Sequence, residues 1–274
     1  MSTTWLDRMR KRVAGLDGDL PWWVSDKLAL NSFCETNDLP APKIYKVWDN
    51  PDDITLHELP DEFVLKPNHM YSARGVMVLS RQSSSSYFDA MTKNSFSESD
   101  IRTLEKELFL KSGNKSSMRF FAEEKVQDEE AQFKIPLDYK IFVFYGKVLL
   151  VSQVNRNTEP KEFAWFDGDF DRLDLTGNIS TNWVHIAPGQ PVKPDSWQEM
   201  LQVAYRASKL LKTPFVTVDM YASTRGAILG ELTLTPGGPF YGEMYKFAPE
   251  LDRRLGDAWA DAQFRIIDEG CKNA

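Results

Sequence analysis

Two strand-like runs in the C-terminal third of the chain each carry one acidic side chain among apolar neighbours. The first run reads FVTVDMY and the second reads ILGELTLT, a composition that favours β-strands. The segment TRG at 224–226 predicts a three-residue hairpin turn that ends on a left-handed glycine. In that register residues 221 and 229 are paired, and Asp219 lies opposite Glu231.

Side chains alternate between the faces of a strand, so this register gives the hairpin one apolar and one oxygen-rich face. The apolar face consists of Val216, Val218, Leu232 and Leu234, and the other of Thr217, Asp219, Glu231, Thr233 and Thr235. Two opposed carboxylates repel unless a cation lies between them. Hard oxygen ligands without histidine or cysteine favour magnesium, which commonly takes one or two carboxylates and completes its shell with water and phosphate oxygens. The alternative is an exposed sheet face with two solvated acids.

Composition narrows the class of protein. The chain has 274 residues, 42% of them hydrophobic, which is enough for one large domain or a few packed subdomains. Its formal net charge of -7 argues against a globally basic surface for nucleic acid. Cys34 and Cys271 lack the spacing of a zinc site or a disulfide framework. No signal-peptide pattern and no apolar run of about 18 residues occurs, so we expect a soluble, cytoplasmic protein without membrane insertion.

Helical and strand patterns alternate along the chain. Residues 1–39 are mostly helical in pattern, with Asp26 and its neighbour Ser25 as candidate N-caps. A helix with Asp195 as its expected cap directly precedes the run FVTVDMY, and a long hairpin that turns at Tyr145 and Gly146 lies further upstream. This mixture predicts an α+β fold.

Several cations could hold a phosphate. Lys66 ends the run FVLK and enters the polar loop NHMYSARG, in which Ser72, Arg74 and Gly75 could donate hydrogen bonds to phosphate oxygens. The loop is not a P-loop, because GxxxxGK[ST] is absent. His69 in the same loop either orients a phosphate or substrate or is an exposed histidine without a role. Further cations, each of which alone suits an ordinary surface charge, are Lys27, Lys125, Lys140 and Arg156.

In chain order, the segments SDKLAL, FVLKPNHMYSARGV, AEEKV, DYKIFVFYGK, VNR, FVTVDMY and GELTLTPGG resemble the ATP-grasp superfamily, and most closely its branch related to the teichuronopeptide biosynthesis protein. The resemblance covers about residues 25–260. It implies an ATP-grasp fold in which two α+β subdomains clasp ATP, with a short helical N-terminal segment. The implied division is an N-terminal segment and lead-in at 1–60, a lid subdomain at 61–126, and a C-terminal subdomain with the metal site at 127–274.

The resemblance also implies roles for individual residues. Lys27 and Lys66 match lysines that contact ATP phosphates, and the loop from Asn68 to Gly75 matches a flexible lid. Glu124, Lys125 and Val126 match a strand that lines the adenine pocket, and Asp138 matches a ribose or hinge acid. The full set implied for ATP is Lys27, Lys66, Ser72, Gly75, Glu124, Lys125, Val126, Asp138 and Lys140. The set implied for magnesium is Asp219, Glu231 and Thr233.

Two positions depart from the family pattern. Thr233 stands where many members have a metal-binding asparagine, and a hydroxyl is a weaker magnesium ligand than an amide carbonyl, so the number of metal ions stays open. Thr217 stands where the branch has an arginine that would stabilise the acylphosphate. Arg156 or Arg74 could take over that role beside Lys66.

The implied reaction converts a carboxylate into an acylphosphate that an amine then attacks. Phosphoryl transfer needs alignment and charge neutralisation rather than a nucleophilic side chain, and the chain carries no evident Ser/His/Asp or Cys/His set. We therefore expect an ADP-forming carboxylate–amine ligase that uses ATP and Mg²⁺ on small-molecule acid and amine substrates. One example is the joining of an amino acid to a uronic acid in surface-polysaccharide or specialised metabolite biosynthesis. The alternatives are an ATP-dependent small-molecule or sugar kinase, and a degenerate homologue that binds nucleotide or glycan without turnover.

Overall fold

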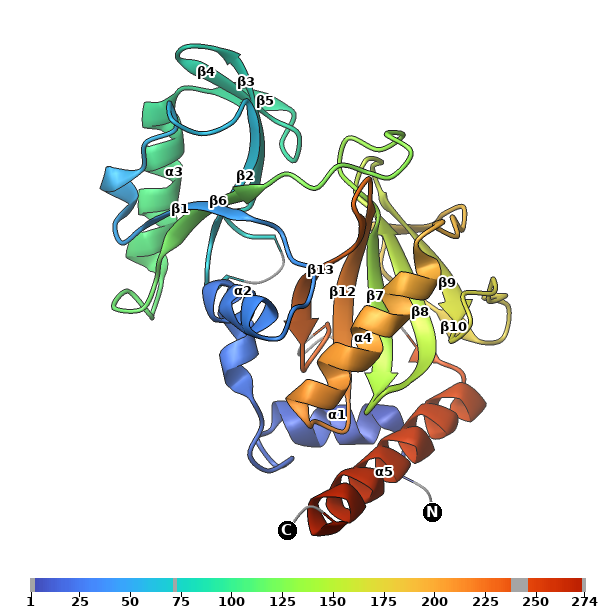
Figure 1. The fold of residues 1–274 in the computed structure, drawn as a ribbon. Helices are drawn as coiled ribbons and strands as arrows, with labels where there is room; N and C mark the ends of the chain where they lie inside the picture. The colour runs from blue at the N-terminus through green and yellow to red at the C-terminus, as the bar shows by residue number, and fades with distance from the viewer. Residues whose placement is uncertain (1–2, 71–72, 238–245, 273–274) are drawn as a thin grey trace.

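The computed structural model describes residues 3–70, 73–237 and 246–272. Figure 1 shows two β-sheets that lie next to each other, each with helices packed against it. The α-helices are α1 (Trp5–Val13), α2 (Lys27–Thr36), α3 (Glu98–Lys111), α4 (Trp197–Leu211) and α5 (Pro249–Lys272), and the short 3-10 helices are η1 (Trp22–Ser25) and η2 (Pro51–Asp53). The expected α+β class is therefore confirmed. No helix among the described residues is both long and apolar enough to cross a membrane.

The first sheet is antiparallel, with the strand order β1-β6-β2-β3-β4-β5. Its strands are β1 (Ile44–Trp48), β2 (Glu62–Pro67), β3 (Met77–Ser83), β4 (Ser86–Asp89), β5 (Asn94–Phe96) and β6 (Phe120–Glu124). Helix α3 begins with a capping box in which Ser97 and Asp100 each bond the other's backbone N–H. It buries Ile101 against Phe63 and Phe120 in the core of this subdomain.

The second sheet has the strand order β11-β9-β8-β7-β12-β13. Its strands are β7 (Asp138–Phe144), β8 (Lys147–Asn155), β9 (Lys161–Asp167), β11 (Ile186–Pro188), β12 (Val216–Ser223) and β13 (Gly226–Thr233). A separate pair joins β10 (Ile179–Ser180) to β14 (Lys246–Phe247). As expected, the β7–β8 hairpin turns at Tyr145 and Gly146, both with positive φ.

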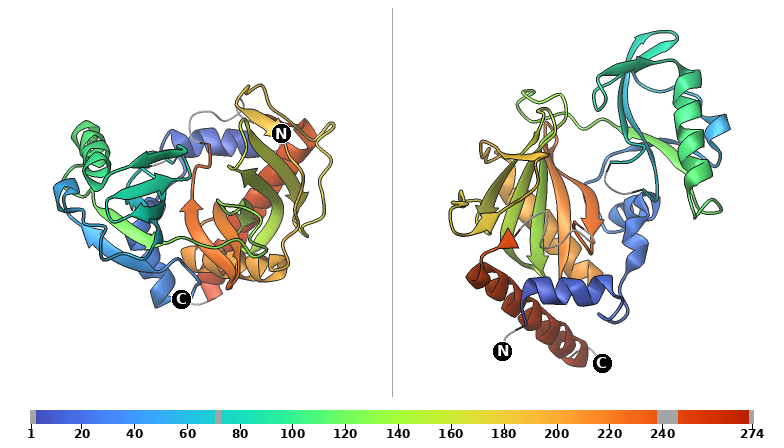
Figure 2. Two further views of the ribbon diagram at one scale, coloured as in Figure 1. Left: turned by 90° about the horizontal axis from the view of Figure 1, so that it is seen from above. Right: turned by 180° about the vertical axis from the view of Figure 1, so that it is seen from behind.

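The two faces of the second sheet differ in what covers them. Helix α4 packs on one face, where the predicted apolar positions of the β12–β13 hairpin are buried in the largest core cluster. At one end of the other face, α1 and α5 pack on a second, strongly aromatic cluster (Figure 2). This aromatic cluster includes Trp5, Phe142, Phe144, Trp165, Phe215 and Trp259. The other end of that face is polar and lies toward the first sheet.

The predicted three-residue turn between β12 and β13 is wrong, although the predicted opposition of Asp219 and Glu231 is confirmed. Ser223 pairs with Gly226 across a two-residue turn, so near the turn the register differs by one residue from the expected one. A bulge at Gly230 then inserts one extra residue in β13 and restores the opposition of the two acids. The bulge suits glycine because a Cβ there would lie 2.5 Å from the ring of Tyr221.

The expected N-cap of α4 is also wrong. The helix begins after Ser196, and Asp195 does not cap it. The carboxylate of Glu129 instead accepts hydrogen bonds from the backbone N–H of Asp195 and from the backbone and side chain of Ser196. A side chain distant in sequence thus stabilises the positive end of the helix, which local sequence cannot reveal.

Candidate functional site

The polar end of the second sheet holds a chain of buried charges. Asp219 on β12 is 4% exposed and lies opposite Glu231 on β13. Lys140, on the neighbouring strand β7, donates to Asp219 Oδ2 and lies 2.9 Å from Asp138 Oδ2. Arg156, just after β8, donates to the same Asp138 oxygen at 3.1 Å. Four adjacent strands, β8, β7, β12 and β13, therefore bring five of the predicted site residues together.

Two carboxylate oxygens in this group have no hydrogen-bond partner. Oδ1 of Asp138 and Oδ1 of Asp219 are both buried, and neither accepts a bond from the described part of the chain. An unpaired buried acceptor costs roughly 1–3 kcal/mol, and more when it is charged. Such oxygens are suited to accept a ligand that carries positive charge.

The charges of the group are unevenly balanced. Burial raises the pKa of Asp219 to about 7, because the negative charges of Asp138 and Glu231 add to the effect of burial and Lys140 only partly offsets them. Burial also acts to raise the pKa of Asp138, but Lys140 and Arg156 outweigh it and the net shift is downward. Burial acts to lower the pKa of Lys140, and the two aspartates more than reverse this. The nearby cations thus balance the negative charge of Asp219 less fully than that of Asp138.

The donor set fits a magnesium ion that relies on substrate for part of its coordination. Asp219 supplies an unpartnered oxygen, Glu231 lies on the opposed strand, and Thr233 lies two residues further on, opposite Thr217. Within the described ranges, no three histidine, cysteine or acidic side chains are grouped so that they could enclose a metal by themselves. Magnesium commonly binds one or two carboxylates and takes its remaining ligands from water and phosphate.

The two lysines that are predicted to contact phosphate belong to elements outside the second sheet. Lys27, at the start of α2, donates to the carbonyl of Met70 at 2.5 Å and lies 3.7 Å from Glu231 Oε1. Lys66, at the end of β2, pairs with Glu123 on β6 at 2.5 Å. Burial lowers the pKa of Lys27, Glu231 acts against this, and the charge of Lys66 lowers it further. Lys27 therefore connects the lysine side of the site to the acidic side.

The residues expected near adenine begin at Glu124, the last residue of β6, and continue just beyond that strand. Glu124 accepts two hydrogen bonds from Arg225, in the β12–β13 turn, at 3.1 and 2.6 Å. Lys125 pairs with Glu62 at 2.5 Å, and Val126 is buried. The contact of Glu124 with Arg225 thus joins the first sheet to the β12–β13 turn of the second sheet.

Other predicted residues lie apart from the charged group or outside the described ranges. Arg74 is exposed. Gly75 has a φ of +72°, and a Cβ there would lie 2.5 Å from Leu108 of α3. Ser72 lies outside the described residues. So do Tyr241 and Tyr245, for which the turn PGGPFYGEMY after the strand of Glu231 predicts contacts with the substrate.

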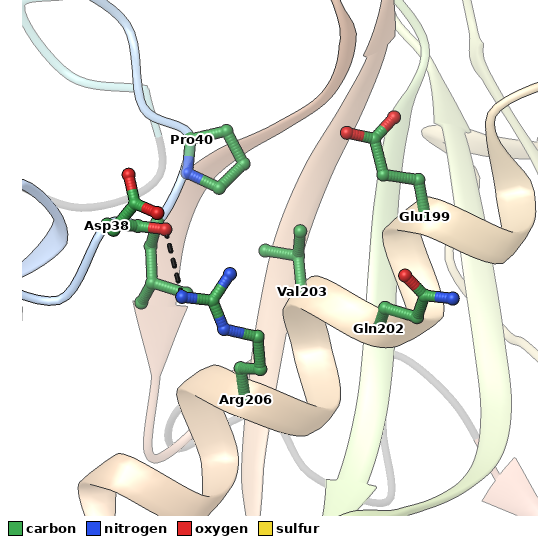
Figure 3. A pocket seen from close by; sticks show the side chains of 7 residues that line it. Asp38, Pro40, Glu199, Gln202, Val203 and Arg206 are labelled. Carbon is green, nitrogen blue, oxygen red and sulfur yellow. Dashed lines mark hydrogen bonds between the residues drawn. The ribbon is translucent and has the colours of Figure 1, made fainter.

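Two surface cavities do not involve the predicted site residues. One, of about 300 Å³, lies between α4 and the segment after α2 (Figure 3). Its lining residues are Asp38, Leu39, Pro40, Glu199, Gln202, Val203 and Arg206. The other, of about 590 Å³, is lined by residues of α5 and of β8. Arg206 donates hydrogen bonds to the carbonyls of Asn37 and Asp38. One border of the first cavity is therefore a contact that holds α4 to the segment after α2.

Sequence reasoning missed two groups of the site. Glu123, the partner of Lys66, was overlooked because only its neighbour Glu124 matched a motif, although alternation along β6 places the two on opposite faces. Asp26 was predicted as a helix cap, which it is, but it also lies 3.3 Å from Nε2 of His69. The residues of that pair are 43 positions apart in the chain, and no local pattern links them.

Comparisons with known proteins identify the family of the chain and solved structures of similar fold. A family model described as TupA-like ATPgrasp matches residues 6–260. The fold is similar to that of D-alanine–D-alanine ligase from Bacillus anthracis complexed with ATP, with a TM-score of 0.52 and 14% identity over 90% of this chain and 68% of that one. It is also similar to L-amino acid ligase from Bacillus licheniformis, with a TM-score of 0.51 and 14% identity over 86% of this chain and 49% of that one. The chain thus spans about half of the second enzyme. A search of curated proteins gave no match.

Proposed function

Because the chain belongs to the TupA-like ATP-grasp family, we propose that it is an ATP-dependent, ADP-forming ligase that joins a carboxylate to an amine. The likeness of fold to a D-alanine–D-alanine ligase and an L-amino acid ligase supports this class of reaction. The proposed substrates are a small acid and an amine, such as an amino acid and a uronic acid in surface-polysaccharide or specialised metabolite biosynthesis. The proposed compartment is the cytoplasm.

One observation carries the proposal. Asp219 and Glu231 face each other on neighbouring strands, and a lysine reaches each of them, Lys140 from β7 and Lys27 from α2. Opposed acids, one with an unpartnered buried oxygen, together with convergent lysines form a site for a metal-bound polyphosphate. An ordinary solvated sheet face would not bury Asp219 to this extent.

Each side of the site has its own task in the proposed reaction. Asp219, Glu231 and Thr233 would hold Mg²⁺, which when bound neutralises charge on the phosphates. Lys27 and Lys66 would bind phosphate oxygens, together with Ser72 and Gly75 of the loop that follows Lys66. The residues proposed to line the nucleotide further are Glu124, Lys125, Val126, Asp138 and Lys140.

The acylphosphate needs positive charge and protection from water. Arg156 donates a hydrogen bond to Asp138, and its remaining N–H groups can stabilise a negatively charged intermediate. Arg74 and Lys66 are proposed to add charge from the lid side. Closure of the first sheet and its loop over the nucleotide would exclude water from the intermediate.

A paired-substrate screen tests the proposal. Purified protein with ATP and Mg²⁺ is incubated with a library of acids and amines, and ADP and products are followed by mass. We expect ADP release that depends on both an acid and an amine, with one amide formed per ADP. A phosphorylated hydroxyl formed without an amine would identify a kinase instead, and ATP binding without ADP release from any pair would identify a nucleotide-binding protein without turnover.

A further inference from the structure

The outer face of helix α5 carries an exposed stripe with two large apolar side chains. Figure 1 shows this helix along the end of the molecule that lies away from the first sheet. Six of its residues follow one another at alternating intervals of four and three, the spacing of a seam along one side of a helix. They are Arg253, Asp257, Ala260, Phe264, Ile267 and Cys271. Phe264 and Ile267, one helical turn apart, are 71% and 65% exposed.

The inner side of α5 accounts for its packing but not for this stripe. Leu251, Leu255, Trp259 and Ala262 are buried in the aromatic cluster of the second sheet. With about 3.6 residues per turn, these positions lie on the side of the helix opposite to Phe264. The outer side of a helix on a globular protein normally carries polar residues. The stripe therefore adds nothing to the core of a single chain.

A groove of about 590 Å³ lies beside the N-terminal half of the same helix. Its floor is apolar, because Leu149 of β8 and Ala258 of α5 line it and are both buried. An apolar floor inside a charged rim suits an apolar side chain that has charged neighbours. The residues of the rim are Lys147, Glu250, Arg253, Arg254, Asp257 and Asp261. One helix thus has an apolar projection in its C-terminal half and an apolar groove beside its N-terminal half.

Two acid–base pairs of the same polarity lie along the flank of α5 that borders the groove. Glu250 precedes Arg254 by four residues, and Asp268 precedes Lys272 by four and lies 2.6 Å from it at the surface. If two copies of α5 run antiparallel about a twofold axis near Asp261, Glu250 faces the partner's Lys272. Arg254 faces the partner's Asp268 in the same register. In a parallel pair equal residues lie at the same height, so these opposite charges do not meet.

The antiparallel register also brings the apolar features together. Phe264 of each copy then lies level with the partner's Ala258, a residue of the groove floor, and the twofold axis repeats the contact. Asp261, near the axis, faces its own copy, and this repulsion limits the affinity. Charge pairing and apolar contact therefore favour one and the same arrangement.

We propose that the chain forms an antiparallel twofold dimer through α5, in which Phe264 and Ile267 of each copy pack on the groove beside the partner's Arg254. The occupant of the exposed stripe is thus a second copy of this chain. Helix α5 packs at the end of the second sheet away from the polar end, so the charged site of each copy stays open. The inference does not rest on the proposed function.

Sedimentation velocity of the full chain over a range of concentrations tests the dimer. We expect the wild type to reach twice the 31.4 kDa mass of the chain. Phe264→Glu should weaken association about tenfold or more, because it would bury a charge on an apolar floor. The control is Val184→Glu, a change at an exposed apolar residue outside α5, which should associate like the wild type. Thermal unfolding shows that each variant keeps its fold. A wild type that is monomeric throughout, or a dimer that Phe264→Glu leaves intact, would overturn the proposal.

Charge reversal tests the register. Arg254→Asp and Asp268→Arg each place like charges at both ends of the interface, so each variant alone should associate severalfold more weakly than the wild type. An equal mixture should recover the dimer, because each variant supplies the charge that the other lacks. Asp261→Asn removes the repulsion at the axis and should strengthen association. Single variants that associate like the wild type, or a mixture no better than its components, would overturn the antiparallel arrangement.

Discussion

Asp219 is the residue on which the proposed magnesium site depends most directly. Exchange for asparagine keeps the volume of the side chain and an acceptor for Lys140 but removes the negative charge that would hold a divalent cation. We expect Asp219→Asn to lower ATP turnover by about a hundredfold or more, as for other charge-neutralising groups in phosphoryl transfer. Turnover is measured as ADP release at saturating substrates, and thermal unfolding shows whether the fold is kept. The exposed Asp53, changed to asparagine, is the control and should leave turnover unchanged.

Thr233 allows a gain of function to be tested. The amide carbonyl of asparagine is a better magnesium ligand than a hydroxyl, and Thr233 lies on the same strand as Glu231 at the position where the family resemblance points to asparagine. Thr233→Asn should lower the Mg²⁺ concentration for half-maximal ADP release severalfold. The same change at Thr235, beyond the end of β13, is the control. An unchanged or higher Mg²⁺ requirement in Thr233→Asn would argue against this position as a ligand.

At the residue scale, the contacts that could be predicted from the sequence are those that depend on the alternation of side chains along a strand. Asp219 and Glu231 could be paired because isolated acids in two neighbouring β-runs leave few registers. Asp26 and His69 could not, because their proximity depends on how the start of α2 packs against the end of β2. Contacts of that kind arise from tertiary structure and have no sequence period.

At the scale of single elements, the β13 bulge positions the acidic pair. Gly230→Ala would place a methyl group 2.5 Å from the ring of Tyr221, so either the ring or the bulge must move. We expect a loss of about 1–3 kcal/mol in the free energy of unfolding, measured by urea titration, together with reduced turnover. Replacing Tyr221 by leucine in the same protein should recover part of the stability. Full stability in Gly230→Ala alone would contradict the steric argument.

Helix α3 contains a buried acid that makes stability depend on pH. Glu105 is 1% exposed, its Oε2 has no hydrogen-bond partner among the described residues, and burial raises its pKa to about 8. Between its ordinary pKa and this value, the folded protein retains a proton that the unfolded chain has released, so the contribution of this group to stability falls as pH rises from about 4.5 to 8.

Glu105→Gln removes this titration. Relative to the wild type, the variant should gain stability on the order of 1 to 4 kcal/mol between pH 5 and pH 8, measured by urea unfolding at both values. Glu107→Gln, at a neighbouring position of the same helix where Lys111 lies 3.4 Å away at the surface, is the control. A wild-type protein whose stability relative to Glu105→Gln stays constant with pH would contradict the argument.

Element boundaries were predictable where their signals are local. The turn at Tyr145 and Gly146 and the cap at Asp26 were correct because turn and cap chemistry act within a few residues. The start of α4 and the β12–β13 turn were wrong because Glu129 and the Gly230 bulge decide them from outside the local sequence.

At the scale of the whole molecule, α1 is tied to the second sheet through one buried guanidinium. Arg12 donates to the carbonyls of Phe215 at 2.8 Å and Leu234 at 3.0 Å, lies 2.6 Å from Asp17, and has its guanidinium 4.2 Å from the ring centre of Trp259 in α5. It thus connects the helix α1, the end of the β12–β13 hairpin and the helix α5.

Removal of this cation should therefore destabilise more than a local segment. Arg12→Met leaves two buried carbonyls and a carboxylate without their donor, which costs about 3–5 kcal/mol in the free energy of unfolding. Urea unfolding followed by tryptophan fluorescence measures the loss. Arg10→Met, on the exposed side of the same helix, should change stability by less than about 0.5 kcal/mol. Equal effects of the two changes would contradict the role given to Arg12.

The α+β class and the ATP-grasp fold could be predicted from the order of the motifs, since the superfamily fixes which segments form which sheet. The contacts that link the two sheets could not be predicted in this way. They depend on contacts such as Glu124 with Arg225 and Lys27 with Glu231, which only the folded chain brings together.

The packing of α1 against α5 also has a consequence for how the protein is made. Trp5 and Arg12 leave the ribosome well before Trp259, against which they are sequestered, because α1 lies far upstream of α5 in the chain. Until α5 has emerged, the nascent chain must therefore carry an amphipathic helix that lacks its final partner. The second sheet cannot complete its aromatic layer until α5 has been synthesised.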